Sequence, residues 1–487
     1  MSNVRRKSCR PNGTIITQEH NPRVTENNPT VTAGNGVKNS MHTFSDQDTR
    51  HLQNKNGAAI APYDFSVPPL IRFGAGRVAD IGEVVGLHGR RAWIVGGGRS
   101  FLRAAVRDTI EASLRAAGIS IEIVAESSGE PTVDQVAASL AGLPWQDRDG
   151  AVVLAIGGGS TIDLAKALAV LATNMPAGCE FPLPASDYEA TVVDHLEGVG
   201  RGCFFEHASL PVVAVPTTAG TGAEATRNAV ISCPRRGFKK SMRSLYLVPR
   251  AAIIDPDLTA SCDHSTTAAA GLDCITQLIE SFICRSSKPL PRALVLESLP
   301  GAVRALPRLL GNLVTKNKLV TQNNLAVGVR DGEAVADQSD GYATDRAALS
   351  HAALLSGMAL ANSGLGMAHG VAAALGVECG TPHGVACALM LPLALRVNSA
   401  VACADLATLE RAIDPAASTH DTAAAAAFVS RIESICCESG LPQTLAQVGL
   451  RRDRIEWLAD HSGGRSMQGN PIDIQPRDLQ RMLTEIF

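Results

Sequence analysis

Short apolar runs and helix-periodic segments alternate along the chain between residues 91 and 254. The run GAVVLAI at 150–156 is apolar throughout, as in a strand that is buried on both faces. Strands that alternate with helices are typical of a mainly parallel α/β sheet with crossover helices. The expected strands are 91–95, 120–124, 150–156, 210–215 and 251–254, and the expected helices are 101–117, 133–143 and 163–173.

The pattern changes after residue 257, where no further strand-like run follows. Segments 265–282, 290–310, 342–361 and 383–401 all have helical periodicity, so the second half is predicted to be all-helical. Residues 1–60 hold few large apolar side chains and are expected to form a disordered tail. The predicted organisation is a tail (1–60), an α/β domain (61–256) and a helical domain (257–487).

One interval, 313–329, differs in composition from both of its flanks. It contains a loose internal repeat, LVTKN followed by LVTQN. Loops tolerate added residues at a small entropic cost. We therefore expect an inserted surface loop at 313–329.

Composition narrows the class of partner. The net charge is −3 and aromatic residues make up 4% of the chain, so nothing favours binding to nucleic acid or to an anionic membrane. The 12 cysteines form no CxxC pair, which is typical of reduced thiols in an intracellular protein. No stretch has the length and apolarity of a membrane span. We expect a cytoplasmic protein with a small-molecule partner and, as a separate expectation, a homo-oligomer.

Two glycine-containing loops follow predicted strands. Gly157, Gly158, Gly159 and Ser160 stand between the strand at 150–156 and the next helix, where backbone N–H groups can approach a phosphate. The second loop, PTTAGTGAE at 216–224, offers hydroxyl groups beside glycines. Either loop alone could be a tight turn, but two at the carboxyl ends of strands favour a dinucleotide site. The threonines of the second loop are Thr217, Thr218 and Thr221.

Two histidines, His369 and His383, occur within one apolar stretch of the second half. Thr381 and Pro382 predict a helix N-terminus, which places His383 in the first turn of a buried helix. A lone histidine there is more often a satisfied core residue than a ligand. The second histidine changes that balance, and so does a pair upstream, Asp273 and Gln277, whose spacing of four puts both on one helix face.

These motifs together resemble the iron-containing (group III) alcohol dehydrogenase family, from about Phe65 to the C-terminus. The resemblance is carried by GGGSTIDLAKALAVL at 157–171, PTTAGTGAE at 216–224, DPDLT at 255–259, GLDCITQLIE at 271–280 and GLGMAHG…TPHG at 364–384. It implies an N-terminal dinucleotide-binding α/β domain, an all-α C-terminal domain of the dehydroquinate synthase-like architecture, and a metal in the cleft between them. The implied metal is Fe(II), with Zn(II) as the alternative, and the implied ligands are Asp273, Gln277, His369 and His383.

The chain departs from the family pattern at three positions. Gln277 stands where the family usually has a histidine, and an amide oxygen is a weaker ligand for iron or zinc. Ala373 stands where many relatives carry a second active-site histidine, so proton transfer there needs another group. Gly97 stands where many relatives carry an aspartate on the adenosine ribose. Without that carboxylate, Arg99 and Ser100 could meet a 2′-phosphate, so NADP is expected to be tolerated beside NAD.

The resemblance also assigns roles to further residues. Lys239 has the spacing at which relatives carry a lysine to the nicotinamide ribose, whereas Asp163 is expected to cap its helix. The cofactor residues are therefore expected to be Gly97, Gly157, Gly158, Gly159, Ser160, Thr217, Thr218, Thr221 and Lys239.

We expect a metal- and NAD(P)-dependent alcohol dehydrogenase or aldehyde reductase, with Asp273, His369 and His383 as catalytic residues. No run of charge marks an anionic substrate, so a small neutral one is the default. A maleylacetate-reductase-like enzyme remains an alternative, and so does a metal-poor homologue that binds nucleotide without turnover. A lyase resembling dehydroquinate synthase shares the architecture, but no clear basic set for its phosphate is present.

Overall fold

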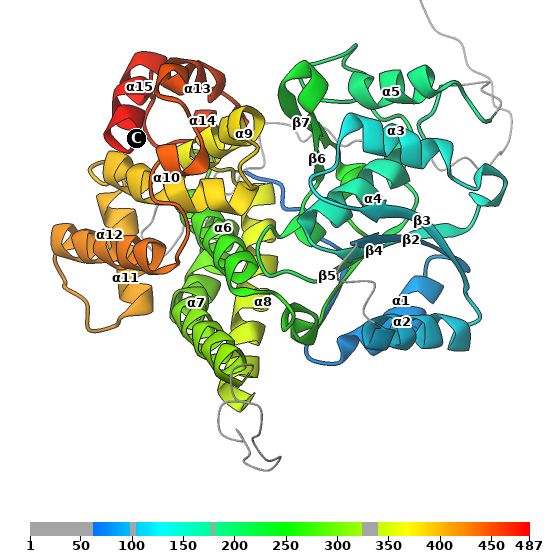
Figure 1. Cartoon of the computed structure of the whole chain (residues 1–487), viewed down its shortest axis with the longest axis horizontal. Coiled ribbons are helices and arrows are strands. Elements are labelled where there is room, and N and C mark those ends of the chain that lie inside the picture. Colours follow the sequence, from blue (N-terminus) through cyan, green and yellow to red (C-terminus); the bar gives the residue numbers. More distant parts are fainter. Residues whose placement is uncertain (1–61, 98–103, 177–180, 324–338) are drawn as a thin grey trace, which may run out of the picture. The chain divides into compact units, whose positions relative to one another are not determined.

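The computed structural model describes residues 62–97, 104–176, 181–323 and 339–487. The expected tail, 1–60, lies outside these residues, as do Arg99 and Ser100. The described chain combines a parallel α/β sheet with a helical region, as expected (Figure 1).

Six parallel strands form one sheet in the order β1-β8-β5-β4-β2-β3. The five strands expected from the apolar runs are confirmed, whereas β1 was not predicted. The adjacent strands β4 and β5 end together, with Gly157 opposite Pro216. Both predicted glycine loops therefore leave the same edge of the sheet. The strands are β1 (Leu70–Phe73), β2 (Arg91–Gly97), β3 (Ser120–Ser127), β4 (Ala151–Gly157), β5 (Val212–Pro216) and β8 (Ala251–Ile254).

Helices cover both faces of this sheet (Figure 1). Every residue of β4 is therefore buried. Val153 and Ala155 point into one core with the helices α3 and α4, while Val152 and Leu154 point into another with α1 and α2. This alternation is the period of two that a strand imposes on its side chains. The helices are α1 (Ile81–Gly86), α2 (Ala104–Ala116), α3 (Val133–Ala141), α4 (Gly159–Leu171) and α5 (Ala185–Asp194).

A second, antiparallel pair of strands, β6 (Asn228–Cys233) and β7 (Phe238–Arg243), was not predicted. The reason is visible in β7, whose sequence FKKSMR contains three cations and no apolar run. The pairing register places Asn228 opposite Arg243 and Ser232 opposite Lys239. This hairpin later forms one wall of the cleft.

The described chain after residue 254 contains helices and no strand, as expected. Leu278, Phe282, Leu306 and Phe428 belong to its largest core, to which several of the helices contribute. The helices are α6 (His264–Ile283), α7 (Pro289–Asn323), α8 (Ser339–Asn362), α9 (Met367–Cys379), α10 (His383–Asn398), α11 (Cys403–Ile413), α12 (Asp421–Glu438), α13 (Ile455–His461), α14 (Arg465–Gln468) and α15 (Pro476–Glu485).

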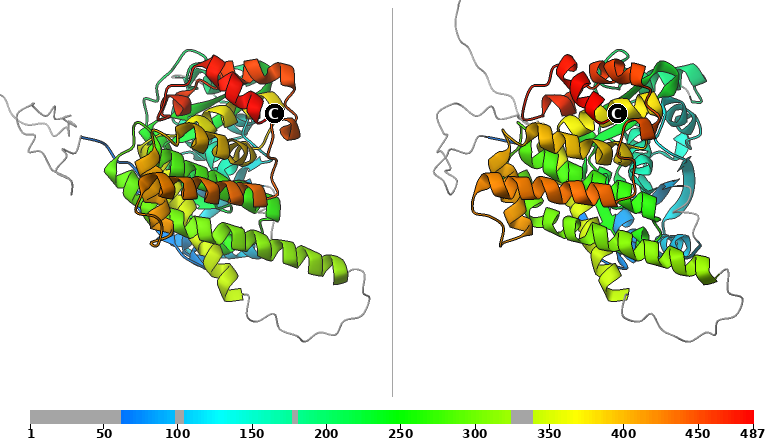
Figure 2. Two further views of the ribbon diagram at one scale, coloured as in Figure 1. Left: turned by 90° about the vertical axis from the view of Figure 1, so that its left-hand side faces the viewer. Right: turned by 60° about the vertical axis from the view of Figure 1, so that its left-hand side comes forward.

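The prediction of a loop at 313–329 is wrong for residues 313–323, which the structure describes as helix. Helix α7 continues through Leu313 and ends at Asn323, and Figure 2 shows it as one long rod. Leu306, Leu309, Leu310 and Leu313 lie at helical spacing in the core, so the apolar stripe carries the helix into the unusual segment. Residues 324–329 lie outside the described chain.

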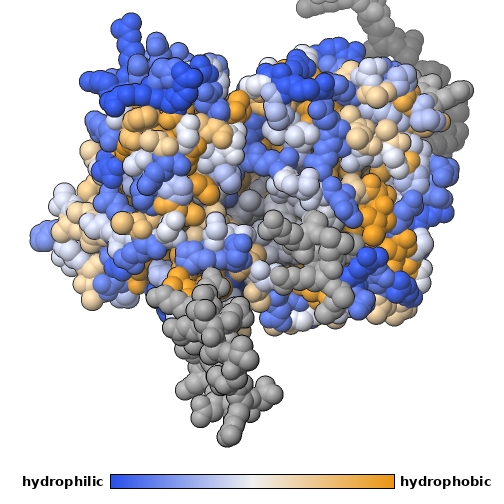
Figure 3. Space-filling model, viewed as in Figure 1, coloured by the Kyte–Doolittle hydropathy of each residue, from blue (hydrophilic) through white to orange (hydrophobic). Residues whose placement is uncertain are grey.

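The face seen in Figure 3 is mostly hydrophilic, with a group of hydrophobic residues on its α/β side. Within the described chain, no single helix combines the length and apolarity needed to cross a membrane. One pair of segments, Gly341–Asn362 with Met367–Cys379, passes the length and composition test jointly and is bent by 98° at its break.

Candidate active site

Helix α6 carries a polar stripe through an otherwise apolar core. Asp263 caps it, accepting a hydrogen bond from the Thr266 N–H at 2.7 Å. Asp273, Gln277 and Glu280 follow at intervals of four and three, which places them on one face. All three are at least 97% buried, so this face is turned toward partners inside the protein.

Glu280 holds the start of α9, which has no capping side chain of its own. Its carboxylate accepts hydrogen bonds from the N–H groups of Gly366 at 2.9 Å and Ala368 at 2.7 Å. The same carboxylate lies 2.7 Å from Nδ1 of His369. A carboxylate at a helix N-terminus is stabilised by the helix dipole. Glu280 therefore holds both the start of α9 and the imidazole of His369. Because Nδ1 faces this carboxylate, Nε2 points away from it.

Helix α10 begins at His383, with Pro382 at the N-cap position. The prediction that Thr381 caps this helix is wrong, because Thr381 lies one residue too early and its buried Oγ1 has no hydrogen-bond partner among the described residues. Gly384 explains how His383 reaches α6. A Cβ at residue 384 would lie 2.4 Å from the Ala269 carbonyl oxygen, so only glycine allows this approach.

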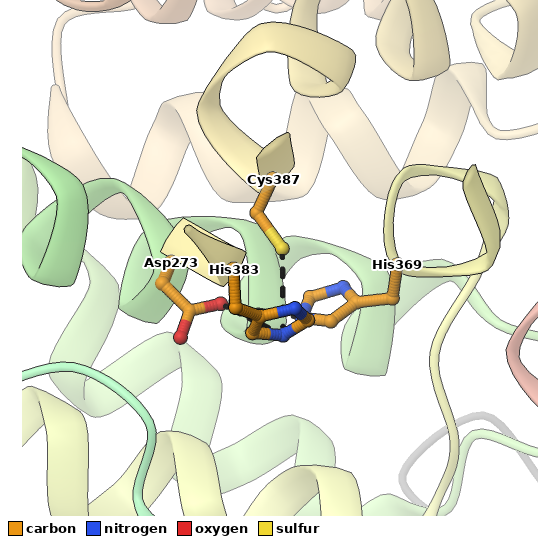
Figure 4. Close-up of side chains that lie close together, drawn as sticks. All are labelled: Asp273, His369, His383 and Cys387. Atoms are coloured by element: carbon orange, nitrogen blue, oxygen red, sulfur yellow. Dashed lines mark hydrogen bonds and ion pairs between the residues drawn. The ribbon is translucent and has the colours of Figure 1, made fainter. Parts of the chain in front are cut away.

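Four side chains from α6, α9 and α10 converge on one point: Asp273, His369, His383 and Cys387 (Figure 4). One donor atom from each lies within 4.8 Å of all the others. Asp273 Oδ1 is 3.4 Å from His369 Nε2 and 3.8 Å from His383 Nε2. Cys387 Sγ is 3.7 Å from His383 Nε2. This arrangement brings together three of the four predicted ligands and adds a thiol.

The donor set fits a tetrahedral transition metal. Asp273 Oδ1 and His369 Nε2 are buried and have no hydrogen-bond partner among the described residues, which is costly unless a ligand completes them. Nitrogen and oxygen donors about 2.1 Å from a tetrahedral metal are separated by about 3.4 Å, and a sulfur and a nitrogen by about 3.6 Å. The observed separations are close to these values.

The pKa values in this cluster follow from burial and from mutual charge. Burial acts to raise the pKa of Asp273, but His383 and His369 outweigh it and hold that pKa below its ordinary value. Burial acts to lower the pKa of His369, but Cys387, Asp273 and Glu280 raise it well above its ordinary value. Burial lowers the pKa of His383 to about 4 and raises that of Cys387 to about 12. The acidic groups around His369 thus stabilise a positive charge at this point of the cleft.

Gln277, the remaining predicted ligand, lies on the same wall. Its Oε1 is 2.7 Å from Ser356 Oγ, a buried hydroxyl on α8. That hydroxyl also lies 2.8 Å from the Ala353 carbonyl oxygen. The amide therefore has a partner on the protein side, unlike Asp273 and His369.

The two glycine loops lie directly against each other. Gly158 adopts extended backbone at the N-cap of α4, which begins at Gly159 and not at residue 163. A Cβ at Gly159 would lie 2.4 Å from Thr221 Oγ1, and one at Gly158 would lie 3.3 Å from Thr218 Oγ1. The Thr217 N–H donates to the Gly157 carbonyl oxygen at 2.9 Å. The structure thus assembles this part of the predicted nucleotide set around the positive end of a helix.

Gly97, at the end of β2, is close to the same loop. A Cβ there would lie 2.9 Å from Thr161 Oγ1 and 3.2 Å from Gly157 Cα. An aspartate at this position therefore needs Thr161 or the loop to move. The role expected for Arg99 and Ser100 concerns residues outside the described chain.

A cleft of about 650 Å³ joins the glycine loops to the metal ligands. Gly159, Ser160 and Thr221 line one side, and His369 and His383 line the other. Hydroxyls, imidazoles and backbone donors in one enclosed space suit a nucleotide and a small second reactant.

Lys239 and Ala373 also line this cleft. Lys239 Nζ pairs with Glu130 Oε1 at 2.6 Å and lies against α9, since a Cβ at Gly376 would be 3.7 Å from it. Ala373 stands four residues after His369 on the cleft side of α9 and offers no titratable group.

Asp163 does not cap its helix, contrary to prediction. It is the fifth residue of α4, accepts a hydrogen bond from the Val230 N–H at 3.0 Å and lies 3.8 Å from the buried Lys166. Burial raises the pKa of Asp163 to about 6 and lowers that of Lys166 to about 8. Glu224 completes this buried set, and burial raises its pKa to about 7.

Sequence reasoning missed two residues of the metal side. Cys387 follows His383 by four residues, a spacing that places both on one helix face. Glu280 follows Asp273 by seven and belongs to the same stripe. Both spacings were readable in the sequence, but the surrounding apolar residues gave no sign that these side chains meet a second helix.

The chain is similar in sequence to one described protein family and to several named proteins. The family description "Iron-containing alcohol dehydrogenase" matches residues 68–256, and "Fe-containing alcohol dehydrogenase family, C-terminal" matches residues 332–487. A protein named "Probable alcohol dehydrogenase EutG" from Escherichia coli is 28% identical over 418 residues, which cover 85% of this chain and 90% of that protein. Lactaldehyde reductase from the same organism is 27% identical over 409 residues, covering 84% and 95%.

Solved structures give the same fold. A crystal structure of 1,3-propanediol oxidoreductase superposes with a TM-score of 0.73 at 24% sequence identity. The match covers 88% of this chain and all of the other.

Proposed function

The chain belongs to the iron-containing alcohol dehydrogenase family, and from that premise we propose that it is a nicotinamide-dependent alcohol dehydrogenase or aldehyde reductase with a metal ion in the cleft. One observation carries this proposal. Asp273 Oδ1 and His369 Nε2 are buried without hydrogen-bond partners among the described residues, and His369 and His383 line the cleft whose other side is the glycine loop. Two reactants bound at these two places would meet.

Asp273, His369, His383 and Cys387 would hold the metal, either Fe(II) or Zn(II). When bound, such a cation polarises an alcohol or carbonyl oxygen and lowers the pKa of the alcohol. Glu280 keeps Nδ1 of His369 engaged, so Nε2 is the nitrogen presented to the cation. Gln277 supports the wall through Ser356.

The nucleotide would lie along the glycine loops. The first turn of α4, at Gly159 and Ser160, presents unpaired backbone N–H groups to a pyrophosphate. Thr218 and Thr221 lie beside these glycines, and Lys239 stands toward the metal side, where a nicotinamide ribose would be. A nicotinamide held there would supply hydride transfer to or from the substrate carbon.

The remaining lining residues position the reactants and exclude water. Leu360, Ala361 and Leu365 give the cleft an apolar section between the loops and the imidazoles. Ala373 supplies no proton acceptor, so the alcohol proton has to leave by water or by a hydroxyl of the nucleotide.

For the choice of nucleotide, we propose that NADP(H) is accepted beside NAD(H). The aspartate that would repel a 2′-phosphate is absent, and Arg99 stands two residues after Gly97. Because Gly97→Asp would collide with Thr161, Arg99→Ala is the better test. We expect it to lower kcat/KM for NADPH about tenfold and to leave that for NADH unchanged, with Arg77→Ala as the distant control. A wild-type enzyme that already rejects NADPH a thousandfold contradicts this reading.

The function as a whole is tested by metal analysis of the purified chain, followed by oxidation of NADH and NADPH with a panel of short aldehydes. We expect about one transition-metal ion per chain and metal-dependent turnover, lost on chelation and restored by Fe(II) or Zn(II). Nucleotide binding without metal or turnover would instead indicate a binding homologue.

A further inference from the structure

The cleft has an excess of positive charge on one wall. Arg227 at the start of β6, Arg243 at the end of β7 and Arg465 on α14 all line it. Arg243 and Arg465 share one described carboxylate, Glu197, which lies 3.1 Å from Arg243 Nε and 3.7 Å from Arg465 Nη2. Arg227 has no ion pair among the described residues. Three cations against one anion leave two positive charges in excess.

The other charged residues of the cleft are balanced. Lys239 pairs with Glu130 at 2.6 Å, and Arg285 pairs with Asp473 at 2.7 Å. Asp163, which also lines the cleft, lies 3.8 Å from the buried Lys166. The excess therefore belongs to the three arginines, which we call the arginine wall: Arg227, Arg243 and Arg465.

Arg227 shows that this wall is incomplete. The residue lines the cleft, and its Nε is buried without a hydrogen-bond partner among the described residues. A buried guanidinium N–H without a partner costs free energy comparable to a lost hydrogen bond, unless a ligand accepts it. Burial, and then the nearby Arg465, lowers the pKa of Arg243, as expected where cations are crowded together. Both observations indicate a missing anion.

The cofactor phosphates are a poor match for this anion. The pyrophosphate is expected at the N-terminus of α4, near Gly159. The residue before Arg227, Thr226, instead contacts the ammonium group of Lys166, which is seven residues further along that helix. Along β7, Arg243 is four residues beyond Lys239 on the same strand face, about 13 Å away. The arginine wall is thus made of residues other than the expected nucleotide contacts.

We propose that the arginine wall binds an oxyanion on the substrate, so that the enzyme acts on a small aldehyde or alcohol that also carries a carboxylate or a sulfonate. This inference rests on the proposed function, since it names the substrate class of that reaction. The reacting carbon would face His369 and His383, and the acid group would face Arg227 and Arg465. Guanidinium groups bind such oxyanions with paired, charge-assisted hydrogen bonds. The expectation of a neutral substrate rested on the absence of a charged run in the sequence. The three arginines are separated by up to 238 positions, so they form no such run, and the proposal replaces that expectation.

The test compares aldehydes of similar size that differ in charge. Succinic semialdehyde is paired with butyraldehyde, and sulfoacetaldehyde with propionaldehyde, using the metal-loaded full chain and saturating NADH or NADPH. We expect kcat/KM for at least one acid aldehyde to exceed that for its neutral partner tenfold or more. The pair that shows this preference tells whether the acid group is a carboxylate or a sulfonate. Equal values for both pairs overturn the proposal while leaving the dehydrogenase function intact.

Variants locate the effect. Arg465→Gln and Arg227→Gln are each expected to raise KM for the preferred acid aldehyde about tenfold and to change kcat/KM for the neutral partner less than twofold. Arg465 is the safer variant for folding, because its side chain is 69% exposed. Arg481→Gln, on the exposed face of α15, is the matched control and should change neither. A rise in KM for the nucleotide instead of the aldehyde assigns the wall to the cofactor and overturns the proposal.

Calorimetry separates this subsite from catalysis. With NAD(P)⁺ bound, 4-hydroxybutyrate should bind more tightly than 1-butanol, more weakly at high salt, and about tenfold more weakly to Arg465→Gln. This outcome without any turnover would refute the proposed function and retain the anion site. Equal binding of the two alcohols would overturn the anion site, whatever the activity.

Discussion

The two sides of the cleft are built in different ways. The nucleotide side is made of backbone, with Gly157, Gly158 and Gly159 leaving room at the start of one helix. The metal side is made of side chains from three helices, which meet only because α6, α9 and α10 pack together (Figure 4). A backbone site is local and tolerates change in its neighbours. A convergent side-chain site depends on every helix that carries a ligand.

The comparison predicts the largest effect for the loss of a metal ligand. His383→Ala should lower kcat/KM at least a thousandfold, about 4 kcal/mol, and should reduce metal content, because a site of few donors cannot lose one without losing affinity. His383 is the ligand of choice, since 30% of its side chain is exposed and the change leaves little cavity. Metal per chain and steady-state kinetics are the measurements. Full metal content with less than a tenfold loss of activity would contradict the assignment.

A smaller and separate effect is expected on the nucleotide side. Gly159→Ala places a Cβ 2.4 Å from Thr221 Oγ1, so the loops must part and KM for NADH should rise about a hundredfold while metal content stays constant. Gly311→Ala is the matched control, because that helical glycine has nothing within 4 Å of an added Cβ. The control should leave KM unchanged and raise stability by about 0.5–1 kcal/mol. Equal losses of metal and nucleotide binding in Gly159→Ala would show that the two sides are not independent.

Replacing the fourth donor distinguishes a sulfur ligand from an amide ligand. In the Co(II)-loaded protein, a cobalt–thiolate bond gives a charge-transfer band in the near ultraviolet. We expect Cys387→Ser to abolish this band and to weaken the metal about 10- to 100-fold. Gln277→Ala is expected to retain the band. The opposite pattern would return Gln277 to the ligand set and leave Cys387 as a packing residue.

The last effect is on stability and not on catalysis, and it concerns the buried charges beneath the nucleotide side. Burial raises the pKa of Glu224 from 4.5 to about 7, so its favourable contribution is complete below pH 4.5 and is lost as the pH rises through 7. Glu224→Gln removes this loss and should match wild type near pH 5 but exceed it at pH 8 by up to about 3 kcal/mol. Thermal unfolding at several pH values measures the gap. A gap that does not widen with pH would mean that Lys166 already compensates the carboxylate.

The sequence by itself determined the parts that are local. Short apolar runs predicted five of the six strands of the parallel sheet, and the loops at 157–160 and 216–224 followed from their places after β4 and β5. Asp273, His369 and His383 were found from helical spacing and from resemblance. Local reasoning failed where the pattern was interrupted, as at the cationic strand β7, and where a helix ran on beyond a change in composition, as at Leu313.

Only the tertiary structure decided which side chains complete each site. Cys387 joins the cluster of Asp273, His369 and His383 because Gly384 lets α10 approach α6, and Glu280 reaches His369 across 89 positions of sequence. The arginine wall likewise combines a hairpin with a short helix near the C-terminus. Spacing along a chain reports which residues share one face of one element. Whether that face meets another depends on packing between distant segments, which no local pattern records.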